Sequence, residues 1–321
     1  MMERRTLGNT DIHISPVALG CWPMTGMTSP GATKEGGLAA IRACFDLGIN
    51  HLDTAYMYGA GGESERFIAE ALGPRRDEMV VATKGGLHWK DGERIHDASC
   101  ATLRRECEES LRRLQTDRVE VYYLHAPDPK VPVAESAGEL KRLLDEGKTR
   151  GVGVSNLSVE QLEAFAAECP IAVCQPPYSM LQRDIEADVL PWCRARGVSV
   201  ACYWPLMKGL LAGRLPRDHV FDRDDSRRKY PMFRGEEWQK SHDMLDKLRP
   251  IAEECGRTLV QLVVNWTIHQ PGVTAAVCGA KRPEQIAETA GGAGWRLTED
   301  QMARINRAIE ERGETSSIPP V

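Results

Sequence analysis

Four side chains that can move or hold a proton lie at or just beyond short apolar runs. Asp53 and Tyr58 belong to HLDTAYMYG, Lys84 to VVATKGG and His125 to VYYLHAP. A free tyrosine has a pKa of about 10 and is a weak proton donor at neutral pH. A nearby ammonium group would lower that pKa, and a carboxylate would hold the ammonium charged and oriented. We therefore expect this group to deliver a proton to a carbonyl oxygen.

A carbonyl carbon that is reduced must also receive a hydride, which no side chain can supply. The four residues therefore imply a nicotinamide cofactor. Each residue taken alone has a simpler explanation. Asp53 and Lys84 could form a structural ion pair, and His125 could be a core histidine. Their shared position after successive apolar runs favours the catalytic interpretation.

The elements that would position these residues alternate along the chain of 321 residues. Short apolar runs predict eight strands, at Val17–Leu19, His51–Ala55, Met79–Thr83, Val119–Leu124, Gly151–Val154, Ala172–Gln175, Ser199–Tyr203 and Val273–Cys278. Helical patterns separate most of them, at Lys34–Leu47, Glu63–Leu72, Cys100–Leu114, Ala134–Glu146, Val159–Glu168, Ile185–Arg196, Glu236–His269 with a break near Gly256, and Glu284–Ala290. Eight strand–helix units predict an α/β fold, a (β/α)8 TIM barrel, as one domain over residues 1–321. An open doubly wound sheet is the alternative, but no GxGxxG follows the first strand.

Three segments lie outside this repeat. Arg5–Leu7 and Ile12–Ile14 flank a GNTD turn and predict an N-terminal β-hairpin that plugs the barrel. Thr298–Glu311 predicts an extra C-terminal helix. Pro205–Gly235 shows no secondary-structure pattern and follows strand seven at the end where barrel active sites lie. We expect it to cover a cofactor or substrate, and a solvated insertion is the alternative.

Composition excludes several function classes. The net charge is −5 with mixed signs and no long basic run, which argues against nucleic acid as a partner. The polar N-terminus has no apolar signal region, and no apolar run of about 20 residues predicts a membrane span. Ten cysteines occur singly, several within apolar runs, which indicates buried reduced thiols and a cytoplasmic protein. The histidines lack the HExxH spacing of a metal site. No pattern indicates an oligomeric state.

At these motifs the sequence strongly resembles the aldo-keto reductase superfamily, from about Arg5 to Ala308. The similar segments are HLDTAYMYG, ATKGG, YYLHAPDP, GVGVSN, QPPYSML, CYWPLMKGLLAGR and GAKRPEQIAET, and the branch is the bacterial-type or potassium-channel-β-like one. The resemblance implies a TIM barrel that binds NADP(H) without a Rossmann domain. It implies Tyr58 as general acid/base, with Asp53, Lys84 and His125 completing the catalytic group. Trp204 departs from the family, which commonly has serine there.

The resemblance also implies the cofactor contacts. The nicotinamide end would be held by Ser155, Asn156, Gln175 and Tyr203, and the pyrophosphate by Leu206, Gly209 and Leu211. The adenosine end would be held by Gly279, Lys281, Arg282, Gln285 and Glu288. Lys281 and Arg282 would lie nearest a 2′-phosphate, which favours NADP(H), with NAD(H) as the alternative. Ser155 and Asn156 could instead cap the following helix.

Aromatic residues Trp22, Tyr56 and Trp89 are expected to frame the substrate pocket, although Tyr56 could serve only for loop packing. Aromatic walls around a polar centre suit a small carbonyl or alcohol substrate. The main expectation is an NADP(H)-dependent oxidoreductase acting on aldehydes or ketones. An NADP(H)-binding redox-sensing regulatory protein and a lyase forming a Schiff base on Lys84 are the alternatives.

Overall fold

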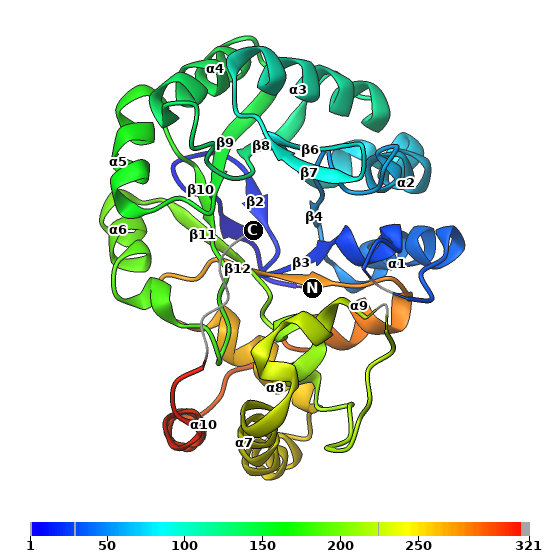
Figure 1. Ribbon diagram of the computed structural model, residues 1–321, viewed down its shortest axis with the longest axis vertical. Helices are drawn as coiled ribbons and strands as arrows, with labels where there is room; N and C mark the ends of the chain where they lie inside the picture. The colour runs from blue at the N-terminus through cyan, green and yellow to red at the C-terminus, as the bar shows by residue number, and fades with distance from the viewer. Residues whose placement is uncertain (1, 29, 224, 316–321) are drawn as a thin grey trace.

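The eight predicted strands close into a parallel barrel (Figure 1). The computed structural model describes residues 2–28, 30–223 and 225–315. The barrel strands are β3 (Val17–Gly20), β4 (His51–Asp53), β5 (Val80–Gly85), β8 (Val119–Leu124), β9 (Thr149–Ser155), β10 (Val173–Gln175), β11 (Ser199–Tyr203) and β12 (Ala275–Gly279). Each pairs with its neighbour in chain order, and β12 pairs with β3. The predicted TIM barrel is confirmed.

Helices surround the barrel in the ribbon view (Figure 1). They are α1 (Lys34–Leu47), α2 (Glu63–Leu72), α3 (Cys100–Leu114), α4 (Val133–Asp145), α5 (Val159–Glu168), α6 (Val189–Arg196), α7 (Gly235–Glu254), α8 (Leu259–Ile268), α9 (Pro283–Ala290) and α10 (Glu299–Arg312). The predicted capping box at the start of α5 is present, with Ser158 accepting from the amide of Gln161. Gly256 stands between α7 and α8 with φ +61°, which accounts for the predicted break.

The predicted N-terminal hairpin consists of β1 (Arg5–Thr6) and β2 (His13–Ile14), which pair antiparallel. Its apolar side chains belong to the cluster that fills the barrel interior, namely Leu7, Ile12 and Ile14 with Ala18, Val80, Ala82, Val121, Tyr123, Val173, Ala201, Ala275 and Val277. Burial of these side chains removes apolar surface from water and anchors the hairpin. The expectation that it plugs the barrel is confirmed.

A second hairpin follows β5 and was not expected. It consists of β6 (Leu87–Lys90) and β7 (Glu93–His96), which pair antiparallel (Figure 1). The turn residues Asp91 and Gly92 have φ +52° and +81°. Two consecutive positive φ angles fit a tight Asp-Gly turn that matches the twist of the flanking strands.

The segment after β11 carries more structure than its sequence suggests. It contains three short 3₁₀ helices, at Met207–Ala212, Ser226–Lys229 and Pro231–Phe233. The expectation that it lacks secondary structure is therefore wrong. Short 3₁₀ turns carry no apolar periodicity long enough to read from sequence.

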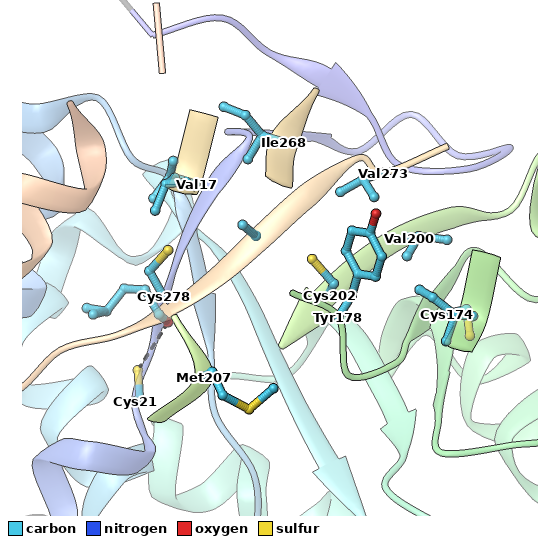
Figure 2. Packing of buried hydrophobic residues seen from close by; sticks show 14 of the residues in the cluster. Val17, Cys21, Cys174, Tyr178, Val200, Cys202, Met207, Ile268, Val273 and Cys278 are labelled. Atoms are coloured by element: carbon cyan, nitrogen blue, oxygen red, sulfur yellow. Dashed lines mark hydrogen bonds between the residues drawn. The ribbon is translucent and has the colours of Figure 1, made fainter. Parts of the chain in front are cut away.

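Sulfur-containing side chains form part of the core around the barrel. Figure 2 shows Cys21, Cys202, Cys278 and Met207 packed among buried aliphatic residues. All ten cysteines are free, and eight of them are buried. Buried thiols behave here as small apolar side chains, as the sequence predicted. None of the helices within the described ranges is both long and apolar enough to cross a membrane.

Candidate active site

An ion pair between neighbouring strands lies at the base of the site. Lys84 Nζ lies 2.7 Å from Asp53 Oδ1 and donates a second hydrogen bond of 2.7 Å to the carbonyl of Thr54. Both charged side chains are buried, with exposed fractions of 1% and 2%. Gln175 Nε2 donates to Asp53 Oδ2 at 2.6 Å, so both carboxylate oxygens are occupied. A carboxylate only accepts, so this contact fixes the orientation of the Gln175 amide.

Tyr58 and His125 complete the group that the sequence predicted. The ammonium of Lys84 lies 5.1 Å from the centroid of the Tyr58 ring. The rings of Tyr58 and His125 meet edge to face with centroids 5.9 Å apart. The structure therefore brings all four predicted residues together from β4, β5, the end of β8 and the loop after β4.

The electrostatic environment differs from the expectation in one respect. Burial, and after it the negative charge of Asp53, raises the pKa of Tyr58 well above its ordinary value. The prediction that Lys84 lowers this pKa is wrong for the chain alone, because burial of the phenol and the negative charge of Asp53 together raise it. Burial and the positive charge of Lys84 lower the pKa of His125 well below its ordinary value. The site therefore holds a neutral phenol beside a neutral imidazole.

The loop that carries Tyr58 is held from behind by an arginine of α3. Arg113 Nη1 donates to the carbonyl of Tyr56 at 3.0 Å and lies 3.2 Å from a carboxylate oxygen of buried Glu65. Gly62 has φ +73°, and a Cβ there would lie 2.5 Å from the same guanidinium nitrogen. Only glycine fits this close approach. Sequence reasoning missed Arg113 and Glu65, because both belong to helical patterns that resemble ordinary charged faces.

Tyr56 contacts the same helix. Its hydroxyl donates to Glu109 at 3.0 Å, and the guanidinium of Arg113 lies 4.2 Å from its ring centroid. These contacts direct the side chain toward α3. They favour loop packing over a place in the substrate pocket.

The other two aromatic residues predicted for the pocket do lie beside Tyr58. Trp22 meets the Tyr58 ring at a centroid distance of 5.0 Å. Trp89 donates from Nε1 to the carbonyl of Met57 at 2.9 Å. Both pack in a small apolar cluster with Tyr58, Ala55, Met57, Leu87 and Ala126. The cluster gives one side of the site an apolar wall.

The residues predicted for the nicotinamide end form a continuous hydrogen-bonded chain. Ser155 donates to the carbonyl of Gln175 at 2.7 Å, and Asn156 Nδ2 donates to the carbonyl of His125 at 3.0 Å. The hydroxyl of Tyr203 donates to Asn156 Oδ1 at 2.8 Å. Asn156 has φ +63°, a left-handed conformation that asparagine tolerates. These bonds fix the side chains of Asn156 and Tyr203 next to His125.

The residues predicted for the pyrophosphate form a tight turn. The amides of Gly209 and Leu211 both donate to the carbonyl of Leu206, at 2.9 and 3.2 Å. The ammonium of Lys208 in this turn lies 4.1 Å from the ring centroid of Trp204. The turn therefore carries a cation in a cation–π contact that sequence reasoning missed.

The residues predicted for the adenosine end gather where β12 meets α9. The amide of Lys281 donates to Gln285 Oε1 at 3.0 Å, and its ammonium group donates to the carbonyl of Pro30. A Cβ on Gly279 would lie 2.8 Å from the ring of Pro23, so this position favours glycine. Arg282 is exposed and has no carboxylate partner within the described ranges. Glu288 forms an ion pair with Arg214.

A buried acid supports the β6–β7 hairpin. Glu106 accepts from the amide of Gly86 at 2.7 Å and lies 2.8 Å from Nδ1 of His88. Burial raises the pKa of Glu106 to about 8. The residue links α3 to the segment that carries Trp89. Its position in a helical pattern gave no sign of this role.

Comparison with known proteins decides the family. Residues 16–310 match the Aldo/keto reductase family. The chain belongs to this family. Aldo-keto reductase YhdN of Bacillus subtilis is 36% identical over 96% of this chain and 94% of its own. The NADH-specific methylglyoxal reductase of Escherichia coli is 31% identical, over 97% and 99%.

Solved structures of aldo-keto reductases share the fold. The glycerol dehydrogenase AKR11B4 of Gluconobacter oxydans has a TM-score of 0.91 and 36% identity, covering 98% of this chain and 97% of its own. The holo form of AKR11C1 of Bacillus halodurans has a TM-score of 0.78 and 27% identity, with 96% of each chain covered. Membership of this oxidoreductase family therefore agrees with the barrel fold and with the grouping of Asp53, Tyr58, Lys84 and His125.

Proposed function

We propose that this aldo-keto reductase reduces small aldehydes or ketones to alcohols, or catalyses the reverse reaction, with NADP(H) as cofactor. One observation supports the proposal above others. Tyr58 lies over the buried pair of Lys84 and Asp53, with the imidazole of His125 beside its ring. Such a group can hydrogen-bond a carbonyl oxygen and give it a proton as hydride addition makes that oxygen negative, so that the product is an alcohol.

A nicotinamide cofactor, when bound, would supply the hydride, and this chain would supply the proton and the charge. Tyr58 stays protonated in the resting site because burial raises its pKa. As the carbonyl oxygen gains negative charge, the phenol gives up its proton at Oη. The ammonium of Lys84 then stabilises the phenolate, while Asp53 holds the ammonium in place. Neutral His125 offers a hydrogen bond to the same oxygen, since the pKa of its imidazole is lowered.

The arrangement of the residues around His125 fits a nicotinamide cofactor. Nδ1 of His125 is buried and has no partner within the described ranges, so a polar group is expected near it. Tyr203 presents a ring whose position is fixed by Asn156. The exposed guanidinium of Arg282 and the ammonium of Lys281 supply positive charge for a 2′-phosphate. We therefore prefer NADP(H) to NAD(H), although one relative is named NADH-specific.

Two alternatives receive less support. A regulatory protein that only binds the cofactor would not need a proton donor over an ion pair. A Schiff-base lyase would need a free amine, but Lys84 donates to both Asp53 and Thr54. The ten free cysteines support a reducing compartment such as the cytoplasm for the proposed enzyme.

The test compares Tyr58→Phe with Tyr56→Phe, which removes a hydroxyl two residues away. Reduction of a panel of reactive aldehydes by NADPH is followed at the cofactor absorbance, and cofactor affinity by fluorescence. We expect Tyr58→Phe to lower kcat by about 10²–10⁴-fold, with cofactor affinity unchanged, because proton transfer contributes about that much. Tyr56→Phe is expected to keep wild-type kcat. Equal kcat for wild type and Tyr58→Phe would refute the assigned role, and turnover with NADH but not NADPH would refute the cofactor preference.

A further inference from the structure

The β6–β7 hairpin turns one of its two faces toward the active site. In the antiparallel register Trp89 lies opposite Arg94, and Leu87 lies opposite His96. Directly opposed residues share a face of the ribbon, and alternate residues along a strand share it too. These four side chains therefore belong to one face, which we call the inner face.

Two observations place the inner face at the Tyr58 site. Leu87 is fully buried in the apolar cluster that includes Tyr58, and Trp89 donates to the carbonyl of Met57. Nδ1 of His96 lies 3.4 Å from the carbonyl of Pro127, two residues beyond His125. The hairpin thus lies against the loops that follow β4 and β8.

Arg94 is the cation on this face, and its charge acts on the site. Its guanidinium has no carboxylate partner within residues 2–28, 30–223 and 225–315. Its positive charge contributes, after burial and Lys84, to the lowered pKa of His125. Burial raises the pKa of Tyr230, in the segment after β11, and the charge of Arg94 partly offsets this rise. Arg94 therefore lies within electrostatic range of residues from two sides of the site.

The opposite face of the hairpin offers a comparison. Lys90 is the residue next to Trp89 and points to the other face, where it lies opposite Glu93. Both cations are exposed and belong to the same short ribbon. They differ in the face on which they lie, and only Arg94 shares the face of Trp89.

We propose that Arg94 binds a carboxylate of the substrate, so that the enzyme prefers carbonyl compounds that carry a negative charge. This inference rests on the proposed function. The guanidinium fork matches a carboxylate in two parallel hydrogen bonds, and a cation without an internal partner is free to make them. The apolar wall of Trp22 and Trp89 would hold the carbon skeleton between that charge and Tyr58. The substrate class is therefore an aldehyde or ketone acid rather than a neutral sugar.

The experiment uses two aldehydes of nearly equal shape that differ in charge, 4-carboxybenzaldehyde and 4-formylbenzamide. The measured quantity is the ratio of kcat/KM for the acid to kcat/KM for the amide, with NADPH at saturation. Wild type is expected to favour the acid, and Arg94→Gln to lower the ratio roughly threefold to tenfold through the KM of the acid. Arg94→Lys should keep part of the preference. Lys90→Gln, which removes a charge from the other face, should keep all of it.

Two further measurements sharpen the test. Raising the salt concentration should lower the acid-to-amide ratio of wild type, because an exposed ion pair is screened. Binding of 4-(hydroxymethyl)benzoate to the NADP⁺-loaded protein, measured by calorimetry, should weaken in Arg94→Gln and not in Lys90→Gln. This second readout does not depend on turnover.

The outcomes separate this inference from the proposed function. If wild type reduces the neutral amide but shows no preference for the acid, the role of Arg94 is refuted and the reductase assignment stands. Equal loss of the preference in Lys90→Gln and Arg94→Gln would show a general charge effect and would also overturn the proposal. If wild type reduces none of a wider aldehyde panel, the proposed function itself fails.

Discussion

The buried pair of Lys84 and Asp53 can be tested by a double-mutant cycle on stability. Lys84→Met leaves the Asp53 carboxylate with one remaining donor, the amide of Gln175. Asp53→Asn turns an acceptor into a group that carries its own N–H donors next to that amide. Each single change therefore leaves an unmatched polar group in a site with almost no solvent exposure. The double variant leaves no unpaired charge.

The magnitude follows from the separation of the two charges. At 2.7 Å and an effective dielectric of about 20, two unit charges attract by about 6 kcal/mol before desolvation is counted. Breaking a buried pair by removing one partner typically costs about 3–5 kcal/mol. We expect each single variant to lose that much free energy of unfolding. The loss in the double variant should be smaller than the sum of the two single losses, by at least about 2 kcal/mol.

The assay is urea unfolding of the four proteins at pH 7, followed by tryptophan fluorescence and circular dichroism. The cycle is valid where both signals give the same transition. The reasoning would be refuted if the loss in the double variant equalled the sum of the two single losses within about 0.5 kcal/mol. Such a result would mean that the two charges are solvated separately in the folded protein.

Two further predictions concern stability and come from other parts of the barrel. Burial raises the pKa of Glu106 to about 8, so the folded state holds an extra proton and stability should fall as the pH rises from about 4.5 to 8. Glu106→Gln keeps an acceptor for the amide of Gly86, and urea unfolding should show that this variant lacks the decrease; a decrease equal to wild type would contradict the assignment. A Cβ on Gly153 would lie 2.3 Å from the ring of Tyr123, so Gly153→Ala should lower the unfolding free energy by about 1–3 kcal/mol. Gly138→Ala is the control, because its Cβ meets nothing within 4 Å inside α4 and should stabilise by about 0.5–1 kcal/mol; equal effects of the two alanines would refute the packing argument.

The barrel could be predicted because its local signals agree with one another. Each buried parallel strand is a short apolar run, and several of the helices between strands begin with a side-chain cap, as α1, α3 and α5 do. The ranges of α1, α2, α3 and α5 match the predicted ranges at both ends. The candidate catalytic side chains could be located because a barrel directs the ends of its parallel strands to one face. Asp53 and Lys84 needed only that rule.

The β6–β7 hairpin could have been predicted but was not. Its Asp-Gly turn is a strong hairpin signal. The first flank, LHWK, alternates between apolar and polar types, but it has only four residues. The second flank, ERIH, carries its one apolar residue, Ile95, on the face opposite Leu87 and Trp89. The two strands therefore do not share one apolar face, which is the pattern expected of a half-buried hairpin.

The contacts of Arg113 with Glu65 and the carbonyl of Tyr56 could not be predicted, because they join residues from separate helices and a loop. Sequence spacing gives which face of a helix a residue occupies, but not which carbonyl of a distant loop it meets. The same holds for Tyr56, whose hydroxyl donates to Glu109 in α3 and does not point into the expected pocket. Contacts of this kind depend on packing between elements.

The raised pKa of Tyr58 changes the role that its neighbours must play. An acidic phenol at rest would be ionised part of the time and unable to give a proton. Because burial and then the charge of Asp53 raise its pKa, the resting phenol keeps its proton, and in the proposed reaction Lys84 would attract the phenol oxygen most strongly as the proton leaves. An interaction that strengthens along the reaction raises kcat, whereas one that is equally strong at rest does not. In the proposed reaction Lys84 would therefore act mainly on the phenolate, while Asp53 would keep the ammonium charged and in place.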